Sequence, residues 1–315
     1  MKILLTGATG FIGKALVVKL LQQNFNVSVV VRGKTSIFSD KVKQYIVDDF
    51  RNNSDLSLAL EGIDCVVHLA AKAHVIDKSK APVLDEFRKI NTEFTLNLAR
   101  QAMASKVKRL IFLSSVGVNG NQNTRAFLKT DIVNPQEPYA ISKCEAEQGL
   151  LSLAQKSDLE VVIIRPPLVY ENDAPGNFGQ LLKWIDAKHP LPLPLGSVHN
   201  QRSFVALDNL VDFITTTISH KNAANEIFLI SDGEDLSTTE LMQKLSQAFN
   251  KKIILLPIPT TWMIFMAKLI GKEDVAIRLF SSLQVDSSKA RKLLDWKPVV
   301  SMDFTLRRIA SEKRV

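Results

Sequence analysis

Cysteine is scarce in this sequence: its 315 residues include only Cys65 and Cys144. Two thiols so far apart give neither the closely spaced pairs of a zinc site nor the framework of a small disulfide-rich domain. We therefore expect a protein without a metal that works in a reducing compartment, the cytoplasm.

Long uninterrupted hydrophobic runs are also absent. The apolar residues after Lys2 reach Gly7 too soon to form the core of a signal peptide. The most apolar stretch, residues 253–271, contains two prolines and Lys268, so it is too interrupted to span a bilayer. We expect no transmembrane segment. We interpret this stretch as containing a buried helix, with contact to a membrane surface as the less favoured alternative.

Basic residues are in excess, but they are not concentrated in one place. There are 40 lysines and arginines against 32 aspartates and glutamates, which gives a net charge of +8. A solvated surface explains this balance better than nucleic acid binding, which gathers cations into a patch. An enzyme with an anionic cofactor and an anionic substrate would have the same balance of charges.

The chain length is sufficient for one large domain or two modest ones.

Three glycines at three-residue intervals follow the first apolar run. Residues 2–6 have the composition of a buried strand, and residues 14–21 place apolar side chains at helical spacing. In such a turn the first glycine permits a tight bend, the second lets a pyrophosphate approach the backbone, and the third lets the helix pack closely. The helix N-terminus then offers N–H groups to the phosphates. The predicted cofactor-binding residues of this turn are Gly7, Gly10, Phe11, Ile12 and Gly13.

No acidic residue stands at the end of the second expected strand, residues 27–31. NAD-binding folds usually carry an acid there to accept the ribose hydroxyls. Arg32 and Lys34 follow the strand instead, where the 2′-phosphate of NADP would lie. The sequence therefore favours NADP(H) as the cofactor. The alternative is NAD(H), with both side chains as solvated loop residues.

Strand and helix patterns alternate as far as Arg165, which indicates an α/β fold with a Rossmann-type doubly wound parallel sheet. The expected later strands lie at residues 44–47, 64–70, 108–114 and 160–165, and the longer helices at 82–105 and 138–156. Pro166 and Pro167 cannot continue a central strand. We expect a dinucleotide-binding domain at 1–165, to which 206–232 returns, and a smaller α/β substrate-binding lobe formed mainly by 166–315.

Three polar residues lie where such a fold carries its chemistry. Ser115 follows the expected strand at 108–114, and Tyr139 and Lys143 share one face of a helix. The pKa of a free tyrosine is about 10, and a nearby lysine or a positive nicotinamide ring favours the phenolate. We predict that Tyr139 moves the proton of a secondary alcohol, that Ser115 hydrogen bonds the same oxygen, and that Lys143 also holds the nicotinamide ribose.

These residues and several short segments resemble the extended branch of the short-chain dehydrogenase/reductase superfamily, close to UDP-glucose 4-epimerases. The segments are His68-Leu69-Ala70-Ala71, Arg165-Pro166, Arg202-Ser203-Phe204-Val205 and Val285-Asp286-Ser287-Ser288-Lys289. The resemblance implies further cofactor contacts at Asp49, Phe50, Leu69, Ala70, Ala71, Asn91 and Pro166. It implies substrate contacts at Ser115, Asn177, Arg202, Arg278 and Leu283. In the family, the residue matching Asp49 binds the adenine amino group, and those matching Asn177 and Arg202 bind the nucleotide diphosphate. His74 is a further candidate for touching substrate.

Two differences from the family, one after the catalytic serine and one at Arg32, limit the reactions that this enzyme can be expected to catalyse. Sugar 4,6-dehydratases and the related decarboxylases carry acidic residues just after the catalytic serine or threonine, where this sequence has Val116 and Gly117. A 4-epimerase or a 4-keto reductase needs no such acid. An epimerase recycles a tightly held NAD, whereas a reductase consumes NADPH, so Arg32 favours the reductase. Leu283 matches a family position where a leucine leaves room for a 2-acetamido group.

Our first hypothesis is NADPH-dependent reduction of a UDP-4-keto-6-deoxy-N-acetylhexosamine at C4. The second is a UDP-glucose or UDP-N-acetylglucosamine 4-epimerase. The third, of another class, is a non-catalytic NADP-binding sensor, which the intact serine, tyrosine and lysine argue against. The resemblance also implies a homodimer through the helices at 82–105 and 139–156.

Overall fold

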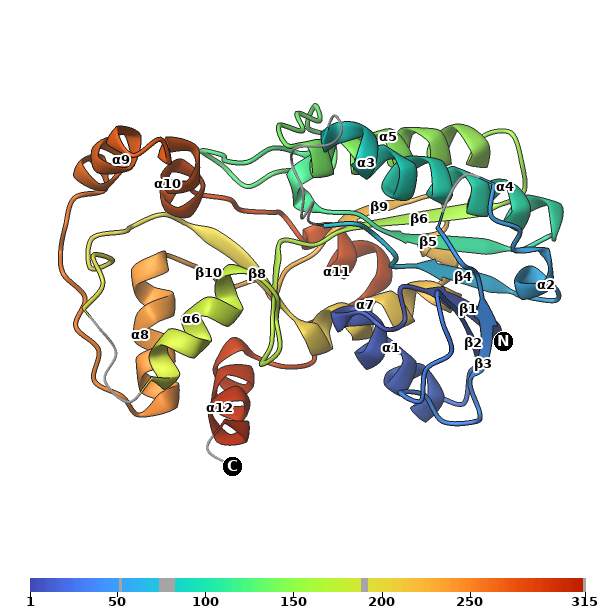
Figure 1. The fold of residues 1–315 in the computed structure, drawn as a ribbon, viewed down its shortest axis with the longest axis horizontal. Coiled ribbons are helices and arrows are strands. Elements are labelled where there is room, and N and C mark those ends of the chain that lie inside the picture. Colours follow the sequence, from blue (N-terminus) through green and yellow to red (C-terminus); the bar gives the residue numbers. More distant parts are fainter. Residues whose placement is uncertain (51–52, 74–82, 188–191, 314–315) are drawn as a thin grey trace.

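A computed structural model describes residues 1–50, 53–73, 83–187 and 192–313 of the protein (Figure 1). Its main sheet has seven parallel strands in the order β3-β2-β1-β4-β5-β6-β9. The strands are β1 (Lys2–Thr6), β2 (Asn26–Val31), β3 (Lys43–Ile46), β4 (Cys65–His68), β5 (Arg109–Leu113), β6 (Glu160–Arg165) and β9 (Ile227–Leu229). The order reverses beside β1, which is the doubly wound Rossmann arrangement that the sequence predicted.

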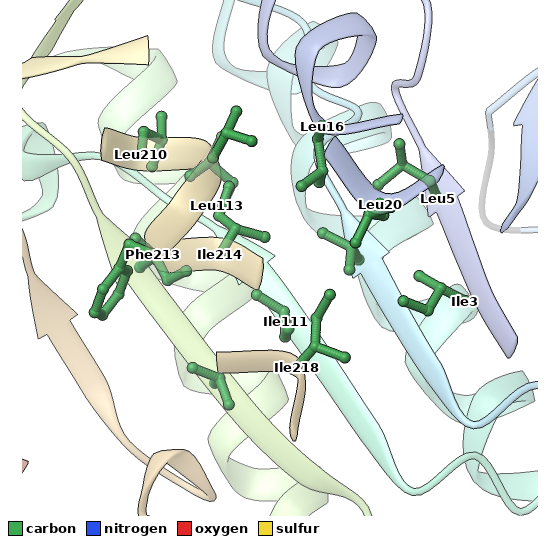
Figure 2. Close-up of a cluster of buried hydrophobic side chains, with 14 of the residues drawn as sticks. Ile3, Leu5, Leu16, Leu20, Ile111, Leu113, Leu210, Phe213, Ile214 and Ile218 are labelled. Carbon is green, nitrogen blue, oxygen red and sulfur yellow. The ribbon is translucent and has the colours of Figure 1, made fainter. Parts of the chain in front are cut away.

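Helices cover both faces of this sheet (Figure 1). One face carries α3 (Val83–Arg88), a π-helical turn (Lys89–Phe94), α4 (Thr95–Ala104) and α5 (Pro138–Ala154), with the short α2 (Ser57–Leu60) nearby. The other face carries α1 (Phe11–Gln22) and α7 (Leu207–Ser219), which contact each other. Figure 2 shows Leu16 and Leu20 of α1 and Phe213 and Ile214 of α7 converging on the sheet. The central strands are therefore apolar on both faces.

The remaining elements form a smaller lobe. Its sheet has the order β10-β8-β7, formed by β7 (Leu168–Tyr170), β8 (Arg202–Ala206) and β10 (Asp235–Leu236). Its helices are α6 (Asn177–Asp186), α8 (Thr238–Phe249), α9 (Thr260–Leu269), α10 (Glu273–Phe280) and α12 (Met302–Glu312), and α11 (Ser288–Leu294) packs near β9. A separate apolar core holds much of this lobe together. The chain leaves the main sheet after Arg165, at the expected pair of prolines, and Ile227–Leu229 pairs with β6.

One expectation about the small lobe was wrong. The apolar stretch 253–271 contains the helix α9, but no residue of α9 is buried. Trp262 is 68% exposed and Leu269 is 65% exposed. The apolar composition predicted burial, but in the described chain α9 is only partly covered, by the small-lobe core at Met263 and by α10. None of the described helices is long and apolar enough to cross a membrane.

Candidate active site

The glycine turn between β1 and α1 is closely packed. Gly7 has φ +73°, and a Cβ atom there would lie 2.6 Å from the amide nitrogen of Ala70. A Cβ atom on Gly13 would lie 2.2 Å from the carbonyl oxygen of Gly7. Gly10 precedes α1 without a side-chain cap, and the first turn of the helix has no acidic residue. The turn thus leaves helix N–H groups and bare backbone facing outward, which fits the phosphates of a dinucleotide.

The far end of this site lies beyond β2 and β3. Arg32 and Lys34 are exposed directly after β2, with no acidic residue between them. Phe50 packs against Phe94, with ring centroids 4.8 Å apart, and Asp49 accepts a hydrogen bond from Ser54 at its backbone carbonyl. The predicted adenine-end residues are therefore held near the edge of the sheet, next to the helical layer.

Asn91 fixes the loop that follows β4. Its Oδ1 accepts a hydrogen bond from the amide of Lys72 (2.8 Å), and its Nδ2 donates to the carbonyl of Lys72 (3.0 Å) and to Ser142 Oγ (3.0 Å). Asn91 is fully buried in the π-helical turn, a distortion that often accompanies functional sites. Leu69, Ala70 and Ala71 lie just before Lys72, whereas His74 lies outside the described residues. One side chain thus ties this loop to α5.

His68 links the same loop to the core in a directional chain of hydrogen bonds. Thr95 Oγ1 donates to the carbonyl of Asn91 (2.7 Å), so it accepts from His68 Nε2 (2.7 Å). His68 Nδ1 then accepts from Thr6 Oγ1 (2.6 Å), which lies 3.4 Å from the donating amide of Ala70. Burial, together with the charge of Lys143, lowers the pKa of His68 to about 3, so the ring is neutral. The sequence indicates His68 only as part of a segment that resembles the family.

Ser115 begins a short 3₁₀ turn (Val116–Val118) at the carboxyl end of β5. Its Oγ accepts a hydrogen bond from the amide of Gly117 at 3.1 Å. A Cβ atom on Gly117 would lie 3.4 Å from Ala140 Cβ, so the turn packs against the start of α5. The amide of Val116 donates to the carbonyl of Pro166, which brings the end of β6 to the same place. No acidic side chain occupies positions 116 and 117.

Tyr139 and Lys143 lie on α5, which begins at Pro138. Lys143 Nζ donates to the carbonyl of Leu113 (2.8 Å) and lies 4.2 Å from the ring centroid of Phe112. Burial lowers the pKa of Lys143 to about 7, against the opposing effect of Glu147. Burial raises the pKa of Tyr139 to about 12. Burial therefore disfavours the expected phenolate, whereas nearby positive charge, such as that of a nicotinamide ring, favours it.

A buried ion pair anchors the same helix. Arg165 Nε donates to Glu147 Oε1 (3.0 Å), and its Nη1 donates to Asn119 Oδ1 (2.9 Å). Arg165 and Glu147 are 3% and 2% exposed. Glu147 was not predicted, although it continues the four-residue spacing of Tyr139 and Lys143 along one helix face. The pair joins α5 to the end of β6 and to the segment after Ser115.

Apart from Ser115, the predicted substrate residues lie on the small lobe. Arg202 Nη1 donates to the backbone carbonyls of Arg278 (2.7 Å) and Ser281 (3.1 Å), and Arg278 forms an ion pair with Glu137. Beside them, a cleft of about 1190 Å³ is bordered by residues 119–138 together with Ile277 and Arg278. Arg278 thus reaches the residue that precedes α5, and Arg202 is held beside the backbone of Arg278.

Two other predicted substrate residues have different surroundings. Leu283 is 8% exposed and packs with Val116, Leu229 and Val285, so its side chain belongs to a small core between the lobes. Asn177 is exposed as the first residue of α6.

Comparisons with known proteins identify the family of the chain. The sequence pattern of the NAD dependent epimerase/dehydratase family matches residues 3–231. A UDP-glucose 4-epimerase of Vibrio cholerae is 43% identical over 300 residues, which cover 94% of this chain and 90% of that protein. An N-acetyl-alpha-D-glucosaminyl-diphospho-ditrans,octacis-undecaprenol 4-epimerase of Escherichia coli O157:H7 is 30% identical, over 91% of this chain and 88% of that protein.

A solved structure has the same fold. The crystal structure of UDP-N-acetylglucosamine 4-epimerase from Bacillus cereus superposes with a TM-score of 0.81 at 21% identity, covering 100% of both chains. With the family pattern and the relative at 43% identity, this leads to one conclusion: the chain belongs to the NAD dependent epimerase/dehydratase family and is an enzyme of the extended short-chain dehydrogenase/reductase type.

Proposed function

We propose that this enzyme oxidises and re-reduces C4 of a UDP-linked hexose, as a 4-epimerase of UDP-glucose or UDP-N-acetylglucosamine that uses NAD(H). The supporting observation is the grouping of Ser115, Tyr139 and Lys143 at the start of α5, with no acid at positions 116 and 117. Dehydration needs a second acid–base pair, whereas oxidation at C4 needs only one proton donor and acceptor. The relative at 43% identity, described as a UDP-glucose 4-epimerase, supports this choice.

Each residue has a defined part in this proposal. Ser115 hydrogen bonds the C4 oxygen, and Tyr139 takes its proton during oxidation and returns a proton during reduction. Lys143, held by the carbonyl of Leu113, places a donor beside the cofactor ribose. A bound nicotinamide supplies the hydride acceptor and donor, and its positive charge favours the phenolate that burial disfavours.

Binding of the cofactor rests on the turn and the loop around it. The backbone of the glycine turn receives the diphosphate, while Asn91 fixes the loop that includes Ala70 and Ala71. Asp49 and Phe50 receive the adenine, and Pro166 lies where the chain leaves the sheet beside Ser115.

The two arginines of the small lobe suit the substrate diphosphate, because a guanidinium donates several hydrogen bonds to phosphate oxygens. Arg202 is held by two carbonyl groups, and burial lowers its pKa. Arg278 lies on the cleft but is paired with Glu137. Asn177 is assigned to the same phosphates. Leu283 acts indirectly, through its packing on Val116 next to Ser115.

A second candidate function is supported by a separate observation. Arg32 is exposed at the end of β2, where an NAD-binding fold usually has an acid. An exposed arginine there suits the 2′-phosphate of NADP. This favours NADPH-dependent reduction of a UDP-4-keto-6-deoxy-N-acetylhexosamine at C4.

One experiment separates the two functions. Purified enzyme is incubated with UDP-glucose, UDP-N-acetylglucosamine and the keto sugar, and nicotinamide absorbance and sugar products are followed together. Interconversion of C4 epimers without net loss of NADH or NADPH supports the epimerase. Stoichiometric loss of NADPH with the keto sugar alone supports the reductase and contradicts the first proposal.

Two variants complete this experiment. If Arg32 binds the 2′-phosphate, Arg32→Asp should lower the ratio of kcat/KM with NADPH to kcat/KM with NADH. An unchanged ratio would mean that Arg32 is a solvated side chain. Tyr139→Phe should lower kcat by at least about a hundredfold. A Tyr139→Phe protein that keeps its full biological function would support the non-catalytic sensor.

We further propose that the enzyme is a homodimer through the helices α3 to α5, as in the family it resembles. Light scattering at micromolar concentration tests this assembly, and a monomeric mass contradicts it.

A further inference from the structure

Helix α9 turns an apolar face away from the protein. Trp262, Phe265, Met266 and Leu269 follow the spacing i, i+3, i+4, i+7, so they share one side of the helix. Their exposed fractions are 68%, 56%, 56% and 65%. A surface helix of a globular protein normally buries such an apolar stripe against the core. Here the stripe that should face a core faces outward.

The exposed apolar surface extends beyond α9. Residues on the preceding segment and on the following helix are also exposed, and together with the stripe they form what we call the α9 patch. Its members outside the stripe are Ile254, Leu256, Ile258, Ile270, Val275 and Leu279. Figure 1 places α9 and α10 at the end of the small lobe that lies far from the seven-stranded sheet. A concentration of large exposed apolar side chains on neighbouring segments is typical of an interaction surface.

The charges beside the patch are mostly positive, with Glu273 at the start of α10 as an acidic exception. Residues 241–272 contain five lysines and no aspartate or glutamate. Lys252, Lys268 and Lys272 are exposed next to the apolar residues. Lys268 lies 3.9 Å from Glu273, which is a loose contact between exposed groups. The patch therefore combines an apolar centre with a cationic margin.

We propose that the α9 patch docks the enzyme on an anionic phospholipid surface, with α9 lying in the plane of the membrane interface. A short helix with tryptophan and phenylalanine on one face and lysines beside it suits this location. Its 10 residues span about 15 Å, which is half of a bilayer core, so the helix lies on the membrane and does not cross it.

Either a membrane or a second copy of the chain could cover the α9 patch, and the charges beside the patch favour the membrane. A symmetric dimer through this patch would bring the same lysine-rich surface of both copies together, so the net positive charges would repel each other. Anionic headgroups neutralise those lysines while the acyl boundary receives the apolar side chains. The cationic margin thus favours lipid as the occupant.

Docking would also orient the cleft that Arg278 borders. α9 packs directly on α10, and α10 carries Ile277 and Arg278 at the border of the cleft. A protein held by α9 would keep that cleft close to the bilayer. The inference rests on the α9 patch alone and holds for either of the two candidate reactions.

Trp262 provides a direct readout of docking. The chain has three tryptophans, of which Trp184 is half-buried and Trp296 is 5% exposed, so Trp262 alone is largely exposed. The full-length protein is mixed with phosphatidylcholine vesicles, with or without about a third of phosphatidylglycerol, and measured by fluorescence and co-sedimentation. We expect a blue shift and sedimentation with the anionic vesicles, both weakened by salt.

Variants separate the apolar and charged parts of the patch. The double variant Trp262→Glu/Phe265→Glu should lose at least about tenfold in vesicle affinity, followed by co-sedimentation. Each of Lys252→Gln and Lys272→Gln should lose about fivefold, since a lysine near an anionic surface contributes about 1 kcal/mol. The matched control is Phe304→Glu on α12, because Phe304 and Phe265 have the same exposed fraction of 56%. This control should bind vesicles as the parent does.

Three results would overturn the proposal. The first is no binding to anionic vesicles at low salt. The second is equal loss of binding in Phe304→Glu and in the double variant. The third is a blue shift of Trp262 that appears with rising protein concentration in the absence of lipid, which would make a second copy the occupant.

Discussion

Arg278 of α10 forms an ion pair with Glu137, the residue directly before Pro138 at the start of the catalytic helix α5. The two residues are 141 positions apart in the chain. The pair joins the small lobe to the dinucleotide-binding part at the mouth of the cleft. The arginine that we assign to the substrate diphosphate is therefore already paired with the Glu137 carboxylate.

The first prediction concerns this competition. Glu137→Gln frees Arg278 for phosphate, so KM for the UDP-sugar should fall by up to about fivefold, the range expected for an exposed ion pair. kcat should change by less than about twofold. Steady-state kinetics measure both constants. Arg278→Gln is the matched variant and should raise KM; if it does so while Glu137→Gln leaves KM unchanged, the two anions do not compete.

The second prediction concerns the glycine turn. Gly13→Ala places a Cβ atom against the carbonyl oxygen of Gly7, which must shift. We expect a loss of at least about 2 kcal/mol in the free energy of unfolding and loss of cofactor affinity. Urea unfolding and cofactor titration measure these effects. Gly33→Ala is the control, because nothing lies within 4 Å of a Cβ atom there. Equal behaviour of the two variants would contradict the assigned close packing.

The third prediction concerns His68. Thr95→Val removes the hydroxyl that accepts from His68 and donates to the carbonyl of Asn91, and it leaves both buried groups without that partner. The expected cost is about 2 kcal/mol of unfolding free energy, with weaker cofactor binding through the Asn91 loop. Thr215→Val is the control, because that hydroxyl donates only to Val211 within α7. A similar, small cost in both variants would argue against the hydrogen-bond chain.

The fourth prediction concerns the pH dependence of stability. Burial lowers the pKa of Lys143 to about 7, whereas an unfolded lysine titrates at about 10.4. Between these values the unfolded chain holds more protons, so the folded state gains stability as the pH rises. Relative to Lys143→Met, the parent should gain up to about 1.4 kcal/mol per pH unit between about pH 7 and pH 10. Urea unfolding of both proteins across this range measures the difference, and parallel curves would contradict the buried lysine.

The sequence alone determined the parts of this protein that depend on local geometry. Three glycines between an apolar run and a helical pattern can form few other structures, because a Cβ atom would clash in the turn. The runs of buried strands and the helix Leu207–Ser219 followed directly from residue periodicity. The sequence also shows that no acidic residue directly follows Ser115, and this disfavours dehydration and decarboxylation.

The tertiary structure decided what depends on distant neighbours. Periodicity identifies an apolar helix face but not what covers it, so α9 was expected to be buried and is exposed. The pairing of Arg278 with Glu137 and the chain from Thr6 through His68 to Thr95 join segments far apart in sequence. The pKa of Tyr139 also depends on the tertiary structure. Its spacing from Lys143 is local, whereas the burial that raises its pKa depends on the packing of the whole fold.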